Sequence, residues 1–302
     1  MSDAFEKFMG KSLRALVFCS DKIPLNSNST SGGGLRSYQL MLLLRSLGFD
    51  VFYVEPDNSE STGSSSEFVF LGNYNLNNQA SFVSGISYDL LLWCNPGTVD
   101  NKLCKNLKES LKHVDFHGPT NLESIHITGE SLHDASKRIV DNLLHVDSFS
   151  FVSVEQKNYW MGMFSCAGFN PDLIDASIVN LALPLYESAY TVESKVRFVF
   201  AGGWHPWLVD EGILLETADL IDAENNAELH FLGGAHTFCD QKYLSLVKLL
   251  KNKESIFFHG FLPHNKFLSF MDQSTCALDL FSKSFERKIA VSTRTVEFIN
   301  NS

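Results

Sequence analysis

Short apolar runs alternate with amphipathic stretches from the start of the chain. Residues 13–20, LRALVFCS, are apolar enough for a buried strand, and residues 27–34, SNSTSGGG, follow as a polar, glycine-rich loop. In residues 35–48 leucine recurs on one helical stripe, and Gly48 is a typical helix end. Residues 49–56, FDVFYVEP, supply a second apolar strand. The pattern therefore predicts one βαβ unit at the start of the chain.

The same alternation continues through the first half of the chain. Further strand-like runs, separated by polar or helix-compatible stretches, occupy residues 68–72, 89–95, 113–118 and 148–154. Because these runs are apolar on both faces, they are typical of a parallel sheet that helices cover on each side. The fold class that we predict is α/β, with a Rossmann-like first domain at residues 1–190.

From residue 196 the pattern starts again. Strand-like runs, with helix-like runs between them, occupy residues 196–203, 227–234, 255–261 and 275–281. We place a second Rossmann-like domain at residues 191–302 and expect residues 183–194 to link the two domains. This second unit shows fewer strands than the first, so we expect it to be incomplete.

Length and charge narrow the class of protein. At roughly 100–200 residues per domain, 302 residues fit two domains. A net charge of -11 argues against a protein that mainly binds nucleic acid, and no apolar run approaches the ~18 residues of a membrane-spanning helix. The N-terminus lacks the apolar core of a signal peptide, so we expect a cytoplasmic protein. The six cysteines contain no CxxC pair, which favours buried free thiols over a metal site or a disulfide.

The glycine-rich loop of the first unit is a candidate ligand site. Gly32, Gly33 and Gly34 lie between the first strand and the first helix, where free N–H groups and the helix dipole favour a phosphate or a polyhydroxy ligand. Arg36 lies in the same helical turn. The alternative, glycines that only permit a tight turn, stays open.

A dinucleotide site of the GxGxxG type is a second enzymatic interpretation. Its third glycine would stand at Ser37, and its glycines would follow the strand closely, whereas a longer loop follows Cys19 here. Glu55, at the end of the second strand, keeps an NAD(P)-dependent oxidoreductase as an alternative.

Two polar side chains stand at the carboxyl ends of predicted strands. His117 follows the strand at 113–118, and Asn95 ends the strand at 89–95. Open α/β sheets bind their ligands at this edge, so His117 is a candidate catalytic group. A capping or packing role is the alternative for both residues.

The first strand of the second unit repeats the glycine turn. Gly202 and Gly203 follow it, and Trp204 and Trp207 come next. If the two glycine-bearing edges face each other, they define an interdomain cleft. The tryptophans can instead be ordinary packing aromatics.

The last predicted helix begins shortly before the end of the sequence. Ser292 or Thr293 is suited to cap it, Arg294 and Glu297 lie in its first turns, and Arg287 precedes it in a polar turn. An arginine with backbone amides binds a diphosphate, and a carboxylate binds two vicinal ribose hydroxyls. A charged helix start is often merely solvated, but at the ligand edge of a sheet this combination suits a sugar nucleotide.

Taken together, these segments resemble the GT-B fold glycosyltransferases, specifically family 4 and its bacterial surface-polysaccharide members. The resemblance is carried by the two α/β units, the loop at 32–37, AGGWHPW at 201–207 and ERKIAVSTRTVEF at 286–298. It implies transfer of a sugar from a nucleotide-diphosphate donor to an acceptor hydroxyl, with retention of configuration and without a metal. The sequence contains no Asp-x-Asp motif, which a metal-dependent glycosyltransferase would be expected to carry.

The resemblance also assigns roles to single residues. Glu297 matches the glutamate that holds the donor ribose, and His117 matches the histidine that contacts the donor sugar near the reacting carbon. The implied donor-binding residues are Gly33, Gly34, Gly202, Gly203, Arg287, Ser292, Thr293, Arg294 and Glu297, and the implied acceptor-side residues are Arg36 and Asn95.

The sequence departs from the family pattern at two positions. The family carries a glutamate eight residues before the ribose glutamate, where this chain has Ile289. The usual phosphate-binding lysine near 210–212 is also missing, so Arg294, Arg287 or Lys288 would supply that charge.

Family members continue past the ribose glutamate with further strands and helices, whereas this sequence ends at Ser302. The resemblance therefore implies a truncated second domain whose exposed sheet edge a complementing chain would cover. A non-catalytic remnant or partner-binding module is the alternative to an active enzyme. The partners that we expect are the nucleotide sugar, as substrate and without a further cofactor, and a glycan or lipid-linked glycan acceptor. A peripheral position of the cytoplasmic protein at the inner membrane face is compatible with such an acceptor. We expect no nucleic acid.

Overall fold

The computed structural model describes residues 12–25, 29–57, 66–183, 195–205, 209–235 and 240–300 of the chain. Their contacts divide these residues into two units. The first unit holds the described residues of Met1–Leu25, Gly33–Leu181 and Ile289–Val291, and the second holds those of Asn26–Gly32, Ala182–Lys288 and Ser292–Ser302. The predicted boundary between residues 190 and 191 lies outside the described residues, as does the predicted linker beyond residue 183.

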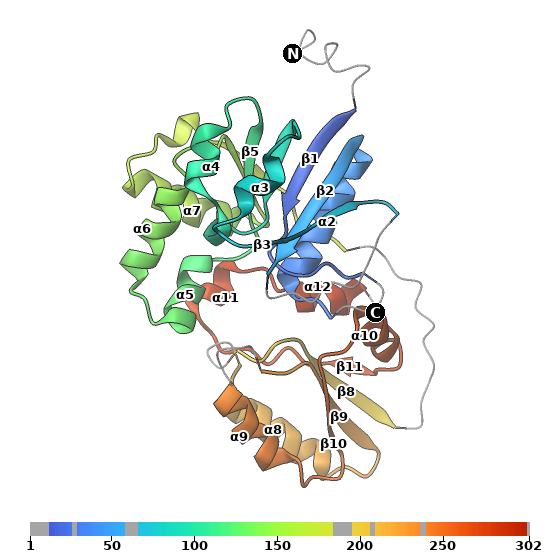
Figure 1. Ribbon diagram of the computed structural model, residues 1–302. Coiled ribbons are helices and arrows are strands. Elements are labelled where there is room, and N and C mark those ends of the chain that lie inside the picture. Colours follow the sequence, from blue (N-terminus) through green and yellow to red (C-terminus); the bar gives the residue numbers. More distant parts are fainter. Residues whose placement is uncertain are drawn as a thin grey trace. The chain divides into compact units, whose positions relative to one another are not determined.

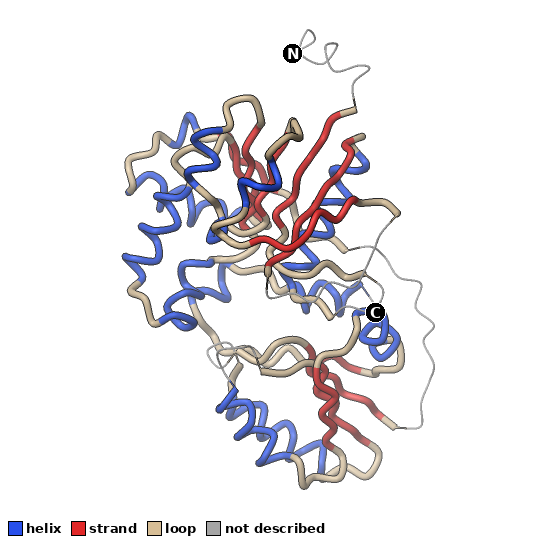
Figure 2. The backbone as a smooth tube through the Cα atoms, in the orientation of Figure 1, coloured by secondary structure: helices blue, strands red, loops and turns tan. Residues whose placement is uncertain are grey.

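The described part of the first unit is built on a seven-stranded, fully parallel sheet (Figures 1 and 2). Its strand order is β3-β2-β1-β4-β5-β6-β7. The strands are β1 (Leu13–Phe18), β2 (Phe49–Pro56), β3 (Val69–Tyr74), β4 (Leu90–Trp93), β5 (Leu111–Phe116), β6 (Ser148–Phe151) and β7 (Asp175–Ile178). Every strand-like run of the sequence is a strand here, and β7 is additional because its short, largely exposed DASI segment forms no apolar run.

Helices cover both faces of this sheet, which explains why its strands are apolar on both sides. On one face α2 (Gly32–Ser46) packs Leu40, Met41 and Leu44 against β1 and β2. On the other face Trp160 packs against Phe116, with ring centroids 4.6 Å apart. The remaining helices are α3 (Gln79–Val83), α4 (Asn101–Asn106), α5 (Thr120–Thr128), α6 (Leu132–Asn142) and α7 (Val154–Cys166), with 3₁₀ turns η1 (Pro96–Thr98) and η2 (Pro171–Leu173).

The strand order of the first sheet reverses between β1 and β4. In open parallel sheets, ligands bind outside the carboxyl ends of the strands at such a switch point. Ser20 and Asn95 stand just beyond the ends of β1 and β4, and His117 directly follows β5. The fold therefore places these polar residues at the edge where a ligand is expected.

The second unit repeats this plan on a smaller scale. Among the residues described, its sheet has four parallel strands in the order β10-β9-β8-β11, so a second switch point lies between β8 and β11. The strands are β8 (Val196–Ala201), β9 (Ala227–Leu232), β10 (Ile256–Gly260) and β11 (Cys276–Ala277). The helices are α8 (Glu211–Asp222), α9 (Asp240–Leu250), α10 (His264–Met271), α11 (Phe285–Ile289) and α12 (Thr293–Asn300).

The core of the second unit also has two faces. On one face Leu214 of α8 and Leu246 of α9 pack against Leu229 of β9. On the other face Met271 of α10 and Phe298 of α12 pack in a smaller cluster. Helices α10 and α12 are thus packed on the same side of the sheet.

Strand β11 is shorter than the predicted strand at 275–281. Only Cys276 and Ala277 pair with β8 in the sheet. The N–H of Leu278 still donates to Val199 O of β8 at 2.7 Å. Beyond Leu278 the chain bonds elsewhere, because Leu280 O accepts the N–H of Asp210 at 3.3 Å and Phe281 forms an antiparallel bridge with Val209. The end of β11 therefore turns away into the loop that precedes α8.

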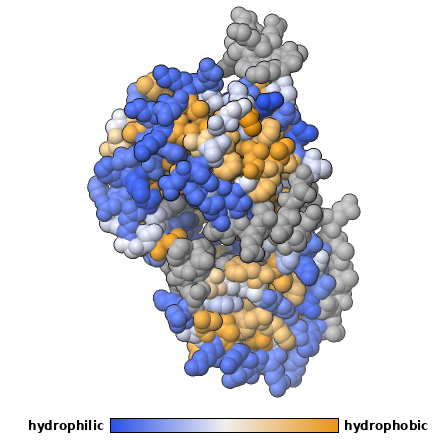
Figure 3. All heavy atoms as spheres, viewed as in Figure 1, coloured by the Kyte–Doolittle hydropathy of each residue, from blue (hydrophilic) through white to orange (hydrophobic). Residues whose placement is uncertain are grey.

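The surface of the first unit is uneven in polarity. In the view of Figure 3, hydrophilic residues gather over α6 and α7, whereas hydrophobic residues gather over β2 and the edge strand β3. Val69 of β3 is 50% exposed. Within the described ranges, no helix combines the length and the apolar character that crossing a membrane requires.

The described cysteines are free thiols. Cys19, Cys94 and Cys104 are buried, as predicted, and burial raises the pKa of Cys94 to about 12. Cys166 and Cys276 are exposed, which the prediction of buried thiols did not include. The buried thiols are poor nucleophiles at neutral pH because their thiolate forms are disfavoured.

Candidate functional site

The first candidate site lies at the carboxyl ends of β1, β4 and β5, where α2 begins. A Cβ on Gly33 would lie 2.4 Å from Ser20 Oγ and 3.5 Å from His117 Nε2, so the helix backbone passes close to both polar groups. Ser37, which replaces the third glycine of a dinucleotide motif, fixes this approach. Its Oγ donates to Gly33 O at 2.9 Å and accepts the N–H of Ser20 at 3.1 Å. The structure thus brings together two predicted site residues, Gly33 and His117.

His117 presents one ring nitrogen to this site. Its Nδ1–H donates to Cys94 O at 2.9 Å, because a carbonyl oxygen can only accept. Burial lowers the pKa of His117 below the ordinary histidine value, and Asp115 opposes this shift only in part. The ring is therefore neutral at pH 7, and its Nε2 lone pair can accept a hydrogen bond from a ligand hydroxyl.

Arg36 does not reach this surface. Its side chain is fully buried, and its Nε and Nη2 donate to the two carboxylate oxygens of Asp115 at 2.9 and 2.7 Å. Its Nη1 donates to Gln39 Oε1 and to Asn180 O. The predicted acceptor-side role is therefore corrected to a structural one, because this guanidinium ties α2 to β5 and has no face open to an acceptor.

Asn95 lies at the predicted edge but uses its side chain locally. Its Oδ1 accepts the N–H of Gly97 at 2.7 Å and caps the turn η1. Its backbone oxygen accepts from Thr98. These contacts shape the turn after β4, and the acceptor-side assignment of Asn95 stays a prediction.

The second candidate site lies at the carboxyl end of β8. Gly202 has a φ of +97°, a conformation that favours glycine. A Cβ on Gly202 would lie 2.5 Å from Arg294 Nη2, so the guanidinium lies directly against the glycine backbone. The same Nη2 donates to Gly203 O at 3.2 Å. The structure thus brings together three predicted donor-site residues from the β8 turn and α12.

Arg294 is a buried cation with unused donors. Its Nε and Nη1 are inaccessible to solvent and have no hydrogen-bond partner among the described residues. The rings of Phe200 and Phe281 lie 5.1 and 4.9 Å from its Cζ. Burial lowers the pKa of Arg294 to about 10, with Asp279 opposing the shift. The group remains charged at pH 7, and its two unsatisfied donors are costly unless a ligand accepts from them.

Side-chain contacts fix the start of α12 beside this arginine. Ser292 Oγ accepts the N–H of Thr295 at 3.2 Å, so Ser292 caps the helix, as predicted. The hydroxyl of Thr295 donates to the carboxylate of Asp279, which follows β11. Thr293 is the first residue of the helix. The bond from Thr295 to Asp279 thus ties α12 to the segment that follows β11.

A second cation lies in α11, the short helix that occupies the place of the predicted polar turn before α12. The Cζ of Arg287 lies 3.8 Å from the centroid of Phe281, the ring that Arg294 also contacts. Lys288 is exposed, and Ile289, which stands where the family carries a glutamate, is buried. Two guanidinium groups therefore meet at one ring, an arrangement that favours an anion nearby.

Glu297, the predicted ribose ligand, is paired with a histidine that sequence reasoning missed. Glu297 Oε1 lies 2.9 Å from His264 Nε2, and the two side chains are 12% and 10% exposed. His264 begins α10, and the two residues are 33 positions apart in sequence. Because no helical or strand spacing connects them, the pattern gave no signal for this pair.

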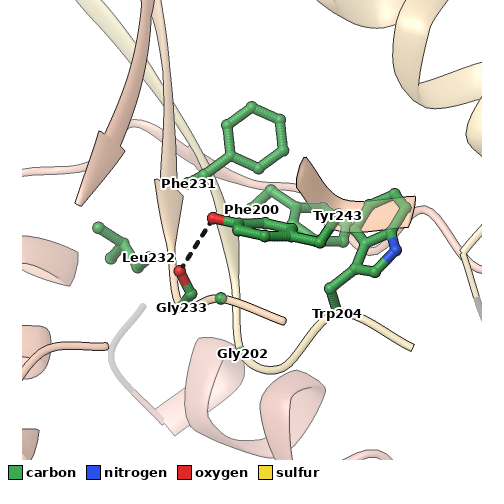
Figure 4. Close-up of a pocket in the computed structure, with 8 residues that line it drawn as sticks. Phe200, Gly202, Trp204, Phe231, Leu232, Gly233 and Tyr243 are labelled. Carbon is green, nitrogen blue, oxygen red and sulfur yellow. Dashed lines mark hydrogen bonds between the residues drawn. The ribbon is translucent and has the colours of Figure 1, made fainter. Parts of the chain in front are cut away.

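A small cavity adjoins the glycine turn of β8 (Figure 4). Aromatic side chains, among them Phe200, Trp204 and Tyr243, line it, and the Tyr243 hydroxyl donates to Gly233 O at 3.4 Å. Trp204 is 2% exposed, and its indole nitrogen has no hydrogen-bond partner among the described residues. Trp204 is therefore a packing residue, the alternative that the sequence left open. Trp207 lies outside the described residues.

Two other kinds of site, for a nicotinamide cofactor and for a metal ion, find no support among the described residues. Glu55, on which the nicotinamide alternative rests, is fully buried, and its Oε1 accepts the N–H of Ile23 at 3.0 Å. It is thus enclosed and does not face a ribose. In the part of the chain that the structure describes, no three His, Cys, Asp or Glu side chains are grouped so as to hold a metal ion.

Comparison with known proteins finds similarity in structure rather than in sequence. No protein-family model and no curated protein sequence matches the chain. A sucrose-phosphate synthase from Thermosynechococcus elongatus matches with a TM-score of 0.63 at 10% identity, over 89% of this chain and 75% of that chain. An alpha-glucosyltransferase in complex with UDP and a 13-mer DNA has a TM-score of 0.59 at 12% identity, over 96% and 78% of the two chains. A trehalose-6-phosphate protein from E. coli bound with UDP-2-fluoro glucose has a TM-score of 0.59 at 8% identity, over 95% and 81%.

Similarity at such low identity establishes architecture. The matched structures have the GT-B fold, and each match extends over most of this chain, through both of its parallel sheets. The predicted class, α/β with two Rossmann-like domains, is therefore confirmed. This chain has the GT-B fold.

Proposed function

We propose that this protein is a glycosyltransferase that moves a sugar from a nucleotide-diphosphate donor to an acceptor hydroxyl. The observation that carries the proposal is Arg294. It is a charged guanidinium at the switch point of the second sheet, beside the glycine turn of β8, with two buried donors that no described residue satisfies. A diphosphate supplies the anionic oxygens that these donors lack.

The proposed roles follow the positions of the side chains. When Arg294 turns from Gly203 O toward the diphosphate, its charge stabilises the negative charge that develops on the leaving group as the glycosidic bond breaks. Arg287 adds a second cation near the same ring. Glu297 binds the two hydroxyls of the ribose. His117 accepts a hydrogen bond from the donor sugar through Nε2.

The finer features of the proposal come from the resemblance. They are a family 4-like enzyme, retention of configuration through attack from the face that the diphosphate leaves, and no requirement for a metal. The acceptor that we propose is a glycan or lipid-linked glycan, met in the cytoplasm at the inner membrane face. Two of the matched structures contain UDP or a UDP sugar, which supports a nucleotide-sugar donor for this chain as well.

A second candidate function is nucleotide-sugar binding without turnover. Ile289 favours it, because a buried aliphatic side chain stands where the family carries a glutamate. The nicotinamide alternative has lost its support, because Glu55 is enclosed and bonded to the backbone.

Thermal melting of the purified chain with a panel of nucleotide sugars tests the donor site. A donor at about 100 times its dissociation constant adds about 2.7 kcal/mol, which raises the melting temperature by roughly 5–10 °C. Arg294→Met should weaken donor affinity at least about 30-fold, since it removes a buried charged partner worth about 2 kcal/mol or more. Arg45→Gln is the control. Arg45 lies in the first unit, its side chain is 52% exposed, and its contact with Asp50 is long, at 3.7 Å.

Release of nucleoside diphosphate from the stabilising donor, with and without a panel of glycan acceptors, separates the two candidates. Turnover supports the transferase, and a melting shift without release supports the binding protein. If no nucleotide sugar changes the melting temperature, or if Arg294→Met and Arg45→Gln bind equally well, the proposed donor site is wrong. Unchanged turnover after removal of divalent metals by EDTA would support the metal-independent mechanism.

A further inference from the structure

The hydrogen bond between His264 and Glu297 joins two different secondary-structure elements of the second unit. His264 is the first residue of α10, and Glu297 lies in the second turn of α12. Both side chains are largely buried, and the Nε2–Oε1 distance is 2.9 Å. A contact with so little exposure is screened far less by solvent and salt than a surface ion pair.

The chemistry of the two groups fixes the direction of this bond. A carboxylate oxygen only accepts, so the hydrogen lies on His264 Nε2 and is donated to Glu297 Oε1. The imidazole is itself held in place, because it stacks on Phe267 with ring centroids 6.1 Å apart and planes 18° from parallel. Phe267 packs in turn against the buried cluster that includes Met271. The donor atom is thus set by the core of the unit.

A glutamate side chain normally samples many rotamers, and fixing it in one of them costs conformational entropy. Here part of that ordering is already present before any ligand arrives, since one carboxylate oxygen is tied to a fixed donor. A carboxylate that binds two vicinal hydroxyls must hold one orientation, in which each hydroxyl can donate to one of its oxygens. Because His264 fixes the plane of the Glu297 carboxylate, it favours a ligand that bonds to Glu297 through both ribose hydroxyls.

We propose that His264 is the positioning residue of Glu297 and that the pair selects nucleoside diphosphates with an intact ribose 2′,3′-diol over their 2′-deoxy counterparts. This inference rests on the proposed function, which makes Glu297 the ribose ligand. It goes further in naming a second residue and the sugar of the nucleotide as the feature that is read. His264 acts through Glu297 and does not touch the reacting atoms.

The test is a comparison of ribose and deoxyribose ligands by isothermal titration calorimetry. The probes are UDP, GDP and ADP, each beside its 2′-deoxy form, titrated into the wild-type chain. The wild type should bind at least one of the ribose forms about 10-fold or more tightly than its deoxy form, since a hydroxyl bonded to a charged group is worth this much. Equal affinities would overturn the proposal without any variant.

The variants then separate positioning from structure. His264→Ala should reduce the ribose preference to less than about 3-fold by weakening the ribose form more than the deoxy form, because the deoxy form keeps only the 3′-hydroxyl contact to Glu297. His264→Gln, whose amide can donate from a similar position, should restore most of the preference. Glu297→Gln should abolish it. Lys266→Ala, an exposed change on the same helix, is the matched control and should leave the preference unchanged.

Two different results would contradict the inference, and they separate a failure of the inference alone from a failure of the proposed function. If His264→Ala weakens ribose and deoxy forms equally, or if His264→Gln behaves like His264→Ala, the histidine has only a structural role while the donor site stands. If no diphosphate binds the wild type and no nucleotide sugar shifts its melting temperature, the proposed function itself fails and this inference fails with it. Should His264→Ala not fold, the comparison of His264→Gln and Glu297→Gln with the wild type decides.

Discussion

The two sheets use a buried arginine in opposite ways. In the first unit Arg36 is fully buried, and Asp115 takes up two of its nitrogens in a bidentate pair. In the second unit Arg294 is buried too, yet among the described residues its Nη2 alone has a hydrogen-bond acceptor, Gly203 O. A buried charge whose donors are all matched within the fold serves the fold. One with donors that no described residue satisfies, such as Arg294, is the feature on which the proposed donor site rests.

The largest expected effect concerns Arg36, the buried arginine that is paired within the fold. Asp115→Ala leaves the Arg36 guanidinium buried without its carboxylate and should cost about 3–5 kcal/mol of unfolding free energy. Urea denaturation followed by circular dichroism measures this loss. Asp50→Ala is the control, because the Arg45–Asp50 pair is long, at 3.7 Å, and about half exposed, so it should cost less than about 1 kcal/mol. Similar losses in both variants would contradict a structural role for the Arg36–Asp115 pair.

A smaller effect is the pH dependence of stability that we expect from His230, a buried and uncharged histidine of the second unit. His230 of β9 contacts His259 at 2.9 Å and Glu228 at 3.3 Å, and burial lowers its pKa to about 4. The unfolded chain, with an ordinary pKa near 6.5, therefore binds the proton more readily. Stability should be fully present above about pH 6.5 and fall by about 2–3 kcal/mol as the pH drops through about 4.

Unfolding in urea at pH 7 and pH 4.5 measures this dependence, and His230→Phe should reduce it. His133→Gln, at an exposed position on α6, is the control. An equally steep acid dependence in the His230→Phe variant would show that other groups cause the loss.

The smallest effect probes the backbone under Arg294. Gly202→Ala places a Cβ at a φ of +97° and 2.5 Å from Arg294 Nη2, so it should cost about 1–2 kcal/mol of stability. Gly162→Ala is the matched control, because Gly162 lies within α7 with no atom within 4 Å of its virtual Cβ. That change should stabilise the chain by about 0.5–1 kcal/mol. Melting temperatures of the two variants should therefore move in opposite directions.

The elements of the fold could be predicted because their information is local. Apolar runs and glycine turns located each strand that borders the two candidate sites, and Ser292 was recognisable as a helix cap from its neighbours alone. Strand β11 was overestimated, since nothing in its sequence shows that Phe281 pairs with Val209 instead of with β8.

The contacts of the sites could be predicted only in part. Arg36 looked accessible in the first helical turn, because its partner Asp115 lies 79 positions away on β5. His264 was missed for the same reason, since it meets Glu297 only through the packing of α10 and α12 on one sheet face. Arg294 was identified as a donor-site residue, but that its donors are buried and unsatisfied depends on tertiary structure.

The platform beside Arg294 is made of main chain. A Cβ at Gly233 would lie 2.1 Å from Gly202 O, so two loops touch there without side chains between them. Only glycine fits at these two positions, Gly202 and Gly233. The main-chain carbonyl oxygens of this surface, in contrast, are present in every residue type. The fold is likewise shared by solved structures that are only 8–12% identical to this chain, so it does not depend on most of its side chains.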